Sequence, residues 1–328
     1  MTGGPVAGMP TPTSRSVHVL GNVQLDVLAS PVVAMPEPGG DDIVDSIAVR
    51  PAGAAGNVSL ALAALEVPHR LFGAVGDDQA GRWVLEELRG LGLADDLLVV
   101  PGRDTGISIA LEAPARERAF LTAHGVLQDY RDGDVPDEAL AADLLLLTGY
   151  FSLPGLRGDG SRRLLSRAGD AGAFTVFDTG WDPEDWHGDA VREVLALLPL
   201  VDVFMPNEPE ALALTGEPDA RRAAAVLAAH CRGWVVVKTG ERGVTARGPE
   251  GETLEVPAPP VTALDTTGAG DSLAAGMLAE LAAGAPLADA LVTGVRVAST
   301  VVGRSSRDRY PRREDLLPAV GAPVLLDW

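Results

Sequence analysis

The residues with the clearest chemistry in this chain form the run Asp265-Thr266-Thr267-Gly268-Ala269-Gly270-Asp271-Ser272. Its small residues let the backbone turn sharply and direct N–H groups to one point, and the Ala- and Leu-rich pattern that follows predicts a helix with a partially positive N-terminus. The run therefore predicts a site for a phosphoryl group. Asp271 is the candidate base, because a positioned aspartate can accept the proton of an attacking hydroxyl in phosphoryl transfer. The alternative is that Asp271 or Ser272 only caps the helix.

Polar side chains beside small residues occur in two more segments. Asp26 follows soon after the apolar run 17–20, and ligands of open α/β sheets collect at the carboxyl ends of strands. Asn57 ends the run 52–57, in which Ala and Gly let a ligand approach the backbone and the Asn amide offers a donor and an acceptor. We expect both to bind hydroxyls of a small acceptor; a turn aspartate and a plain helix cap are the alternatives.

The elements that must position these residues alternate along the chain. Apolar runs typical of strands are followed by helical patterns, which predicts a doubly wound, mostly parallel sheet flanked by helices. Strands are expected at 17–20, 70–75, 144–147, 173–177, 201–205 and 234–238, and helices at 57–65 and 79–91. The segments 30–50 and 104–123 show β-like alternation without helices between, which indicates a small inserted β lid. A surface loop is the alternative for 30–50.

The composition excludes several classes of partner. A formal net charge of −20 argues against nucleic acid and anionic membranes, which select basic surfaces. The single cysteine, Cys231, forms no intrachain disulfide and favours a reducing compartment. Residues 1–14 lack a basic start and an apolar core, so they predict a disordered tail before one domain over 15–328. Apolar runs end before membrane length, and we expect a cytoplasmic protein.

The run 265–272 closely resembles the C-terminal signature of the ribokinase-like (PfkB-type) carbohydrate kinases, and the resemblance covers about residues 16 to 318. It implies ATP-dependent transfer of a phosphoryl group to a primary hydroxyl of a small sugar, with Asp271 as the catalytic base. The backbone amides that hold the transferring group would belong to Gly268, Ala269 and Gly270. The residues that match the family's sugar-binding positions are Gln24, Asp26, Gly53 and Asn57.

The same resemblance implies a binding site for the nucleotide and a metal ion. Asn207 and Glu210, spaced N-x-x-E after the expected strand 201–205, would organise Mg²⁺ and phosphates largely through water, since Mg²⁺ needs few direct carboxylates. A helix first turn, where Glu is favoured, is compatible with that role. Lys238 and Gly240 lie in a strand-to-turn run that is similar to the family's ATP loop. Asp178 also matches a position where relatives carry an aspartate.

Two stretches depart from the family pattern. Ala52 stands where a glycine is typical, which narrows the pocket slightly and leaves the identity of the substrate open. The stretch 303–307 reads Gly-Arg-Ser-Ser-Arg, where relatives commonly have a loop with a Gly-Ala pair. That loop, together with the positions of Asp265 and Thr267, binds a monovalent cation in many relatives. A K⁺ site at Asp265 and Thr267 is therefore an open question.

The resemblance leaves the acceptor open. A nucleoside kinase on the same scaffold needs an apolar surface for a base, and the 4% aromatic content with no aromatic cluster in the lid favours a sugar. A sugar-binding regulator without catalysis is the alternative of another class, and retention of Asp271 argues against it. Sugar acids are disfavoured for lack of a clear Arg/Tyr pair, although Arg116 and Arg118 keep them possible.

Three further features lie in the lid segment 104–123 and just beyond it. Phe120 is a candidate for contact with the ligand, with a packed aromatic as the alternative. His124 is more readily explained as a surface histidine. Lid strands with an open edge favour pairing with a second copy, so a homodimer through the lid is expected.

Overall fold

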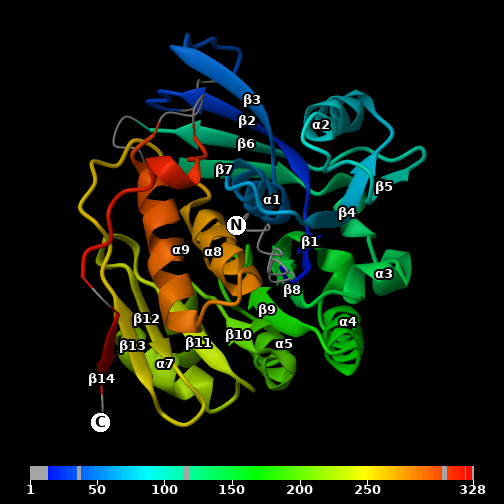
Figure 1. Ribbon diagram of the computed structural model, residues 1–328. Helices are drawn as coiled ribbons and strands as arrows, with labels where there is room; N and C mark the ends of the chain where they lie inside the picture. Colours follow the sequence, from blue (N-terminus) through cyan, green and yellow to red (C-terminus); the bar gives the residue numbers. More distant parts are fainter. Residues whose placement is uncertain (1–13, 35–37, 114–117, 305–308, 322, 327–328) are drawn as a thin grey trace, which may run out of the picture.

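The computed structural model describes residues 14–34, 38–113, 118–304, 309–321 and 323–326. Its main element is a ten-stranded sheet in the order β14-β13-β12-β11-β10-β9-β8-β1-β4-β5 (Figure 1). Neighbours from β11 to β5 run parallel, and β12 to β14 extend the sheet in antiparallel pairs. The strands are β1 (Val17–Gly21), β4 (Arg70–Gly76), β5 (Leu97–Val100), β8 (Leu144–Thr148), β9 (Phe174–Asp178), β10 (Val203–Phe204), β11 (Trp234–Lys238), β12 (Val244–Arg247), β13 (Thr253–Val256) and β14 (Val324–Leu326). The expected doubly wound, mostly parallel sheet is confirmed.

Helices cover both faces of this sheet. They are α1 (Ala54–Ala64), α2 (Gln79–Arg89), α3 (Asp137–Leu140), α4 (Asp159–Asp170), α5 (Ala190–Leu197), α6 (Glu208–Thr215), α7 (Ala220–Ala228), α8 (Ala269–Ala282) and α9 (Leu287–Val302). Because side chains of a strand alternate between faces, Val17 and Val19 of β1 belong to the core cluster that includes α1, α8 and α9, whereas Leu20 belongs to the cluster on the other face, which includes α4 and α7. Figure 1 shows α8 and α9 side by side on the first face. The first residues of α1 and α8 come together there.

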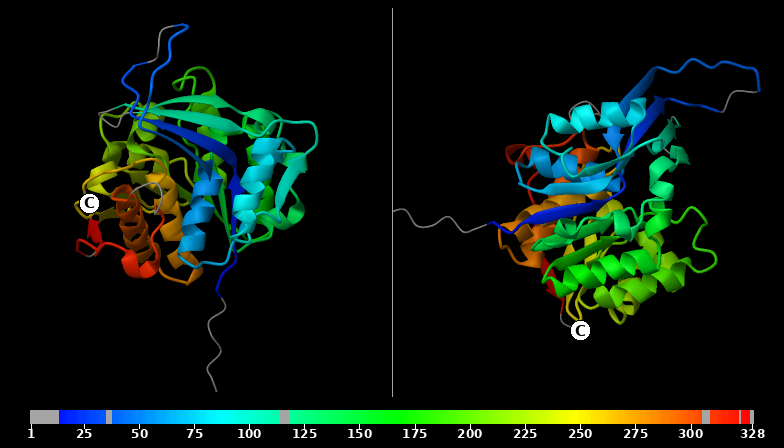
Figure 2. Two further views of the ribbon diagram at one scale, coloured as in Figure 1. Left: turned by 90° about the horizontal axis from the view of Figure 1, so that it is seen from above. Right: turned by 90° about the vertical axis from the view of Figure 1, so that its right-hand side faces the viewer.

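A second, four-stranded sheet lies across one edge of the main domain (Figure 2). Its order is β3-β2-β6-β7, with β2 (Gln24–Ser30), β3 (Ser46–Ala52), β6 (Ile107–Glu112) and β7 (Arg118–Ala123). We call it the small sheet. The segment 30–50 contributes less strand than expected, since β2 ends at Ser30 and β3 begins at Ser46. Pro31 and Pro38, which lie between them, have no N–H for a strand ladder.

The two faces of the small sheet differ in polarity. One face carries the cross-strand row Arg50, Asp26, Ser108 and Thr122, which looks toward the main domain. The opposite face carries the row Val49, Val27, Ile109 and Leu121. Near α2 this apolar face is covered, but Val49 is 48% exposed and Leu121 is 57% exposed. The small sheet therefore presents polar groups inward and apolar groups to solvent.

Several boundaries differ from the sequence prediction. The strand expected at 201–205 is limited to β10, and Met205 alone separates it from Pro206, a residue without an N–H donor. The helix expected from Asn57 begins three residues earlier, at Ala54. The disordered tail was expected at residues that, apart from Ser14, lie outside the described ones. Within the described part of the chain, no helix is long and apolar enough to cross a membrane.

Candidate active site

Helix α8 places Asp271 in its first turn. The N-cap of α8 is Gly268, with left-handed backbone angles of φ 67° and ψ 14°. Asp271 Oδ2 accepts a hydrogen bond from Asn57 Nδ2 at 2.8 Å, whereas Ser272 Oγ donates to the carbonyl of Gly268 at 2.8 Å. Asp271 thus bonds to a side chain of α1, which is not the pattern of a helix cap. Asn57 lies inside α1, whose N-cap is Gly53, so Asn57 is not a cap either.

The carboxyl of Asp271 titrates close to neutral pH. Burial raises the pKa of Asp271 to about 6, and the negative charge of Asp178 adds to the rise. The hydrogen bond from Asn57 and the positive charge of Lys238 lower the pKa in part. A carboxylate with this pKa is ionised at pH 7 and binds a proton more readily than an exposed aspartate does.

Gly268 lies close to Asp271 and leaves little room for a side chain. A Cβ on Gly268 would lie 3.2 Å from Arg309 Nη2, 3.3 Å from Asn57 Nδ2 and 3.4 Å from Asp271 Oδ2. Three polar groups from three separate segments therefore surround one point at the start of α8. The N–H groups and the dipole of a helix start favour an anion there.

Lys238 connects the ends of two strands to α8. It is the last residue of β11, and its Nζ donates to Oδ2 of Asp178, the last residue of β9, at 2.5 Å. A Cβ on Gly270 would lie 3.2 Å from Lys238 Nζ. Burial lowers the pKa of Lys238, but the charges of Asp178, Glu210 and Asp271 outweigh burial and raise it. The charged ammonium is therefore held beside the first turn of α8.

Glu210 and Asn207 bind each other at the start of α6. Asn207 donates from its N and Nδ2 to the two carboxylate oxygens of Glu210 at 2.8 and 2.7 Å, and Glu210 N donates to Asn207 Oδ1 at 2.8 Å. Burial raises the pKa of Glu210 to about 7; Lys238 opposes the rise and Asp178 adds to it. Glu210 thus caps a helix and also belongs to the electrostatic group around Lys238.

The carboxylates near Lys238 suit a hydrated Mg²⁺. Asp178, Glu210 and Asp271 interact electrostatically, and Asp178 raises the pKa of both other carboxyls. In the described residues no group of three His, Cys, Asp or Glu side chains is arranged to hold a metal ion directly. Mg²⁺ keeps several waters and takes oxygen ligands, so these residues fit an ion bound through water.

The row Asn22, Gln24 and Asp26 lines the small-sheet side of the site. Asn22 Nδ2 donates to Gln24 Oε1 at 3.1 Å, and Gln24 Nε2 donates to Asp26 Oδ1 at 3.0 Å. Asn22 Oδ1 accepts from the N of Ala54 at 3.0 Å, which ties the row to α1. Gly53, at φ 89°, is required there because a Cβ would lie 2.3 Å from the carbonyl oxygen of Asn22. Burial raises the pKa of Asp26.

Arg50 is a member of the site that the sequence motifs did not reveal. It lies opposite Asp26 in the β3–β2 register, with Arg50 Nη2 3.8 Å from Asp26 Oδ2. Its Nη1 lies 3.7 Å from Asp265 Oδ2, so Arg50 links the small sheet to the segment before α8. Little in the sequence indicates this role. Arg50 directly precedes Pro51 and the run of small residues, and that spacing does not show which way the Arg50 side chain points.

Arg309 and Tyr310 complete this side of the site and were also missed. Arg309 Nη1 donates to Asp265 Oδ2 at 2.5 Å, and Tyr310 OH donates to Asn57 Oδ1 at 3.2 Å. Thr267 N donates to Asp265 Oδ1 at 2.9 Å. Arg309 and Tyr310 both follow α9, far in sequence from Asn57, so only the fold brings them to the site.

Other expected residues lie at the margins. Gly240 is in an exposed turn after Lys238. Phe120 is 53% exposed and lies on the same face of the small sheet as Asp26. His124 is partly buried at the N-cap of a short 3-10 helix. Arg116 lies outside the described residues.

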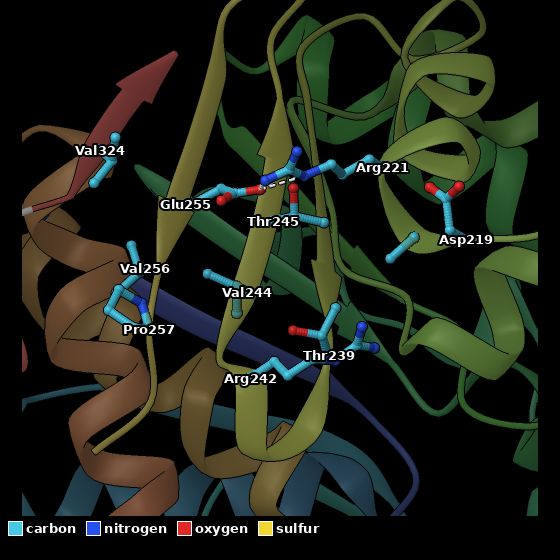
Figure 3. A pocket seen from close by; sticks show the side chains of 11 residues that line it. Asp219, Arg221, Thr239, Arg242, Val244, Thr245, Glu255, Val256, Pro257 and Val324 are labelled. Atoms are coloured by element: carbon cyan, nitrogen blue, oxygen red, sulfur yellow. Dashed lines mark hydrogen bonds and ion pairs between the residues drawn. The ribbon is translucent and has the colours of Figure 1, made fainter. Parts of the chain in front are cut away.

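A separate cavity of about 510 Å³ adjoins the turn at Thr239 and Arg242 (Figure 3). It lies beside the start of α7 and the strands β12 and β13, and the ion pair between Arg221 and Glu255 crosses it at 2.6 Å (Figure 3). None of the expected site residues lines it. Its paired charges provide no base beside an anion site, so the candidate active site is the one around Asp271.

The sheet order, the two helical layers and the small sheet define a ribokinase-like α/β fold. Ribokinase from Thermotoga maritima has a TM-score of 0.78 at 22% identity, over 92% of this chain and 97% of that one. Ribokinase from Arabidopsis thaliana, in complex with ribose and ATP, has a TM-score of 0.76 at 22% identity over the same shares. An Escherichia coli protein solved with ATP and Mg²⁺ has a TM-score of 0.76 at 21% identity, over 91% and 96%.

Residues 15–311 match the pfkB family of carbohydrate kinases, and the chain belongs to this family. It is 30% identical over 316 residues to the uncharacterized sugar kinase YegV of Escherichia coli K12, with 94% of each chain covered. It is 30% identical over 261 residues to an ATP-dependent ribose-1-phosphate kinase of Halopiger xanaduensis (79% and 82%) and 28% identical over 260 residues to a cytidine kinase of Thermococcus kodakarensis (77% and 87%). The protein is therefore a kinase of the sugar and nucleoside type.

Proposed function

We propose that this protein transfers the γ-phosphoryl group of ATP to a primary hydroxyl of a small sugar. The position of Asp271 carries the proposal. It lies in the first turn of α8, it is hydrogen-bonded to Asn57 at 2.8 Å, and its pKa is raised to about 6. A base of this kind beside a helix start that attracts phosphate meets both needs of phosphoryl transfer to an alcohol.

In the proposed reaction, the acceptor oxygen forms a bond to the γ-phosphorus while the bond from that phosphorus to the β,γ-bridging oxygen breaks. Asp271 takes the hydroxyl proton, and ADP leaves. Backbone amides of Gly268, Ala269 and Gly270 donate to the transferring group, whose charge is spread over its oxygens in the transition state. Asn57 orients the carboxylate of Asp271 through its 2.8 Å hydrogen bond.

The acceptor would lie between the small sheet and the start of α8. Gln24 and Asp26 would bind its hydroxyls from the small sheet, and Gly53 and Asn57 from α1. The inward polarity of the small sheet supports this placement. Movement of the small sheet as a lid would exclude water and limit hydrolysis of ATP.

The nucleotide would occupy the other side of α8, with Asn207, Lys238 and Gly240 near its phosphates and ribose. The ammonium of Lys238 beside Gly270 supports this assignment. Mg²⁺, held through water beside Glu210, would offset the charge of the phosphates when bound. The Escherichia coli structural neighbour solved with ATP and Mg²⁺ is consistent with this pair. We also propose that the protein is cytoplasmic.

A nucleoside acceptor is the second candidate, because a cytidine kinase is among the relatives. The polarity of the pocket favours a sugar. In the four described strands of the small sheet the only aromatic residue is Phe120, which is 53% exposed. Tyr310 has its hydroxyl bound to Asn57, so it offers a polar edge to the site.

K⁺ at Asp265 and Thr267 remains a prediction that one contact opposes. The guanidinium of Arg309 binds Asp265 Oδ2, and this positive charge of the protein would take the place of a bound K⁺ ion at that oxygen. We propose that activity depends little on K⁺. Equal initial rates in potassium and tetramethylammonium buffers are the expected result.

A homodimer through the exposed apolar face of the small sheet is also proposed. Val49, Ile109 and Leu121 lie in one cross-strand row and are 48%, 37% and 57% exposed. Pairing two such faces would remove this apolar area from water. We propose no nucleic acid or membrane partner, in view of the net charge of −20.

The test is a coupled assay of ADP release with Mg-ATP against ribose, fructose, sugar phosphates, sugar acids, adenosine and cytidine. The wild type is measured beside Asp271→Asn and a control, Asp137→Asn, whose side chain is 92% exposed. We expect turnover of at least one sugar, and a loss in kcat of about 1,000-fold in Asp271→Asn with an unchanged acceptor Kd. Wild-type kcat in Asp271→Asn would contradict the mechanism, and turnover of nucleosides alone would move the function to the second candidate.

A further inference from the structure

One buried and one partly buried arginine at the acceptor side have unsatisfied hydrogen-bond donors. Among the described residues, no partner is found for Nε and Nη1 of Arg50 or for Nε and Nη2 of Arg309. The side chain of Arg309 is 4% exposed and that of Arg50 is 16% exposed. Buried donors of a charged group are costly to leave unpaired, so four of them in one place indicate a missing acceptor of hydrogen bonds.

Both guanidinium groups face the same region. Nη1 of each lies near Asp265 Oδ2, at 3.7 Å for Arg50 and 2.5 Å for Arg309. Arg309 Nη2 also lies 3.2 Å from the position that a Cβ on Gly268 would take, which Asn57 Nδ2 and Asp271 Oδ2 border as well. The unpaired Nη2 of Arg309 therefore adjoins the point at which the acceptor hydroxyl would meet Asp271, and the unpaired Nη1 of Arg50 lies on the other side, at the Asp265 carboxylate.

The carboxylates already present do not satisfy these donors. Arg50 approaches Asp26 and Asp265 only to 3.8 and 3.7 Å, beyond hydrogen-bond range. Burial lowers the pKa of Arg50, and the nearby charge of Arg309 lowers it further. An anion between the two guanidinium groups would relieve their repulsion and accept their N–H groups, and planar guanidinium matches carboxylate and phosphate oxygens in pairs.

We propose that the acceptor carries an anionic group, a phosphate ester or a carboxylate, which binds between Arg50 and Arg309 while its primary hydroxyl faces Asp271. This inference rests on the proposed kinase function and narrows its substrate class. Tyr310 follows Arg309, but its hydroxyl already donates to Asn57, so the two guanidinium groups are the ones that would hold the anionic group.

The test compares each neutral sugar with its anionic counterpart in wild type, Arg50→Gln and Arg50→Lys. One arm uses sugar phosphates (ribose 1-phosphate beside ribose, fructose 6-phosphate beside fructose), and the other uses sugar acids (gluconate and 2-keto-3-deoxygluconate). Arg162→Gln, whose side chain on α4 is 52% exposed, is the matched control. Arg309→Lys is the second site variant, because it keeps a cation near Asp265.

We expect wild type to prefer one anionic acceptor, and the arm in which it lies identifies the group. Loss of a charge-assisted hydrogen bond should raise the acceptor KM in Arg50→Gln by roughly 10- to 100-fold, with kcat little changed. Arg50→Lys should recover part of the loss, and Arg50→Gln should raise the KM of neutral sugars less than that of their anionic counterparts. Titration of the same acceptors into Asp271→Asn and Asp271→Asn/Arg50→Gln measures binding without turnover, and only the double variant should have lost affinity.

Three outcomes would overturn the inference. Preference of the wild type for neutral sugars or nucleosides would leave the kinase intact and remove the anionic acceptor. An equal fall in kcat for all acceptors in Arg50→Gln would mean that the arginine acts on the transferring phosphoryl group. No turnover and no binding with any acceptor would defeat the proposed function, and this inference with it.

Discussion

The two ends of the site are built in opposite ways. At the phosphoryl end, Asp271, Lys238 and Glu210 come from core elements and bind partners within the protein, at 2.5 to 2.8 Å. At the acceptor end, Arg50 lies on the small sheet and Arg309 follows α9, and both keep unpaired donors. We infer that the proposed phosphoryl end is assembled before ligand binds, and that the proposed acceptor end is completed by the ligand.

In this account the groups that act in phosphoryl transfer and the groups that select the acceptor lie in different parts of the site. Changes at Arg50 or Arg309 would alter which acceptor binds without moving the base, since the carboxylate of Asp271 is held by Asn57 of α1. Changes at the phosphoryl end would affect every acceptor alike. A family that keeps the first end and varies the second can serve many substrates, as the different acceptors in its relatives' names suggest.

The largest loss of activity is expected from Gly268→Ala, because Gly268 lies where the phosphoryl end and the acceptor end of the site meet. An alanine at φ 67° costs about 1–2 kcal/mol of backbone energy. Its Cβ would also crowd Arg309, Asn57 and Asp271, at 3.2 to 3.4 Å. Because misplaced catalytic groups are costly, we expect kcat/KM to fall roughly 100-fold for all acceptors, with a lower Tm.

Gly160→Ala is the control for this change. Gly160 lies in α4, away from the site, and a Cβ there would meet its nearest atoms only at 3.7 Å. We expect its activity and Tm to stay near those of wild type. A Gly268→Ala variant as active as Gly160→Ala would show that the start of α8 tolerates displacement.

The pH dependence of kcat/KM should show whether the two ends of the site act separately. The base must be ionised, so with a pKa of about 6 for Asp271, kcat/KM should fall about tenfold per pH unit below 6 and level off above it. Lys238→Met should move the midpoint upward, since Lys238 lowers this pKa. Arg50→Gln should leave the midpoint in place. A shift with Arg50→Gln equal to that with Lys238→Met would mean that the two ends are not separate.

The stability of the ligand-free protein should follow the same titration. The pKa of Asp271 is raised on folding from 3.8 to about 6, so its contribution to stability is full below pH 3.8 and is lost as pH rises through 6. Between pH 5 and pH 7 this group therefore lowers the Tm. Asp271→Asn removes the contribution, and its Tm should change less than that of wild type over this interval.

The smallest effect on activity is expected from the outer face of the small sheet. Val49→Lys/Leu121→Asp should convert a dimer to a monomer in light scattering coupled to size-exclusion chromatography, with kcat/KM within about threefold of wild type. Val226→Lys, on α7 at 38% exposure, is the control. A wild type that is monomeric at all concentrations would remove the dimer proposal.

Features that depend on residues close together in the chain were predicted from the sequence, whereas residues that only the tertiary structure brings together were missed. The run 265–272, the βαβ alternation and the N-x-x-E pair depend on residues close in the chain, and the fold class and family are confirmed. Arg50, Arg309 and Tyr310 have no motif, because their role depends on the register of β3 with β2 and on where the chain returns after α9. The alternating apolar residues of 104–123 predicted the strands β6 and β7, whereas the face on which Ile109 lies follows from the register of β6 with β2.

A crystal structure with Mg²⁺, a non-hydrolysable ATP analogue and the best acceptor tests the central claim most directly. We expect the primary hydroxyl oxygen within about 2.6–3.2 Å of the Asp271 carboxylate and in line with the γ-phosphorus. The anionic group of the acceptor should lie between Arg50 and Arg309. An acceptor bound with its hydroxyl away from Asp271, or with no group against either arginine, would contradict the account.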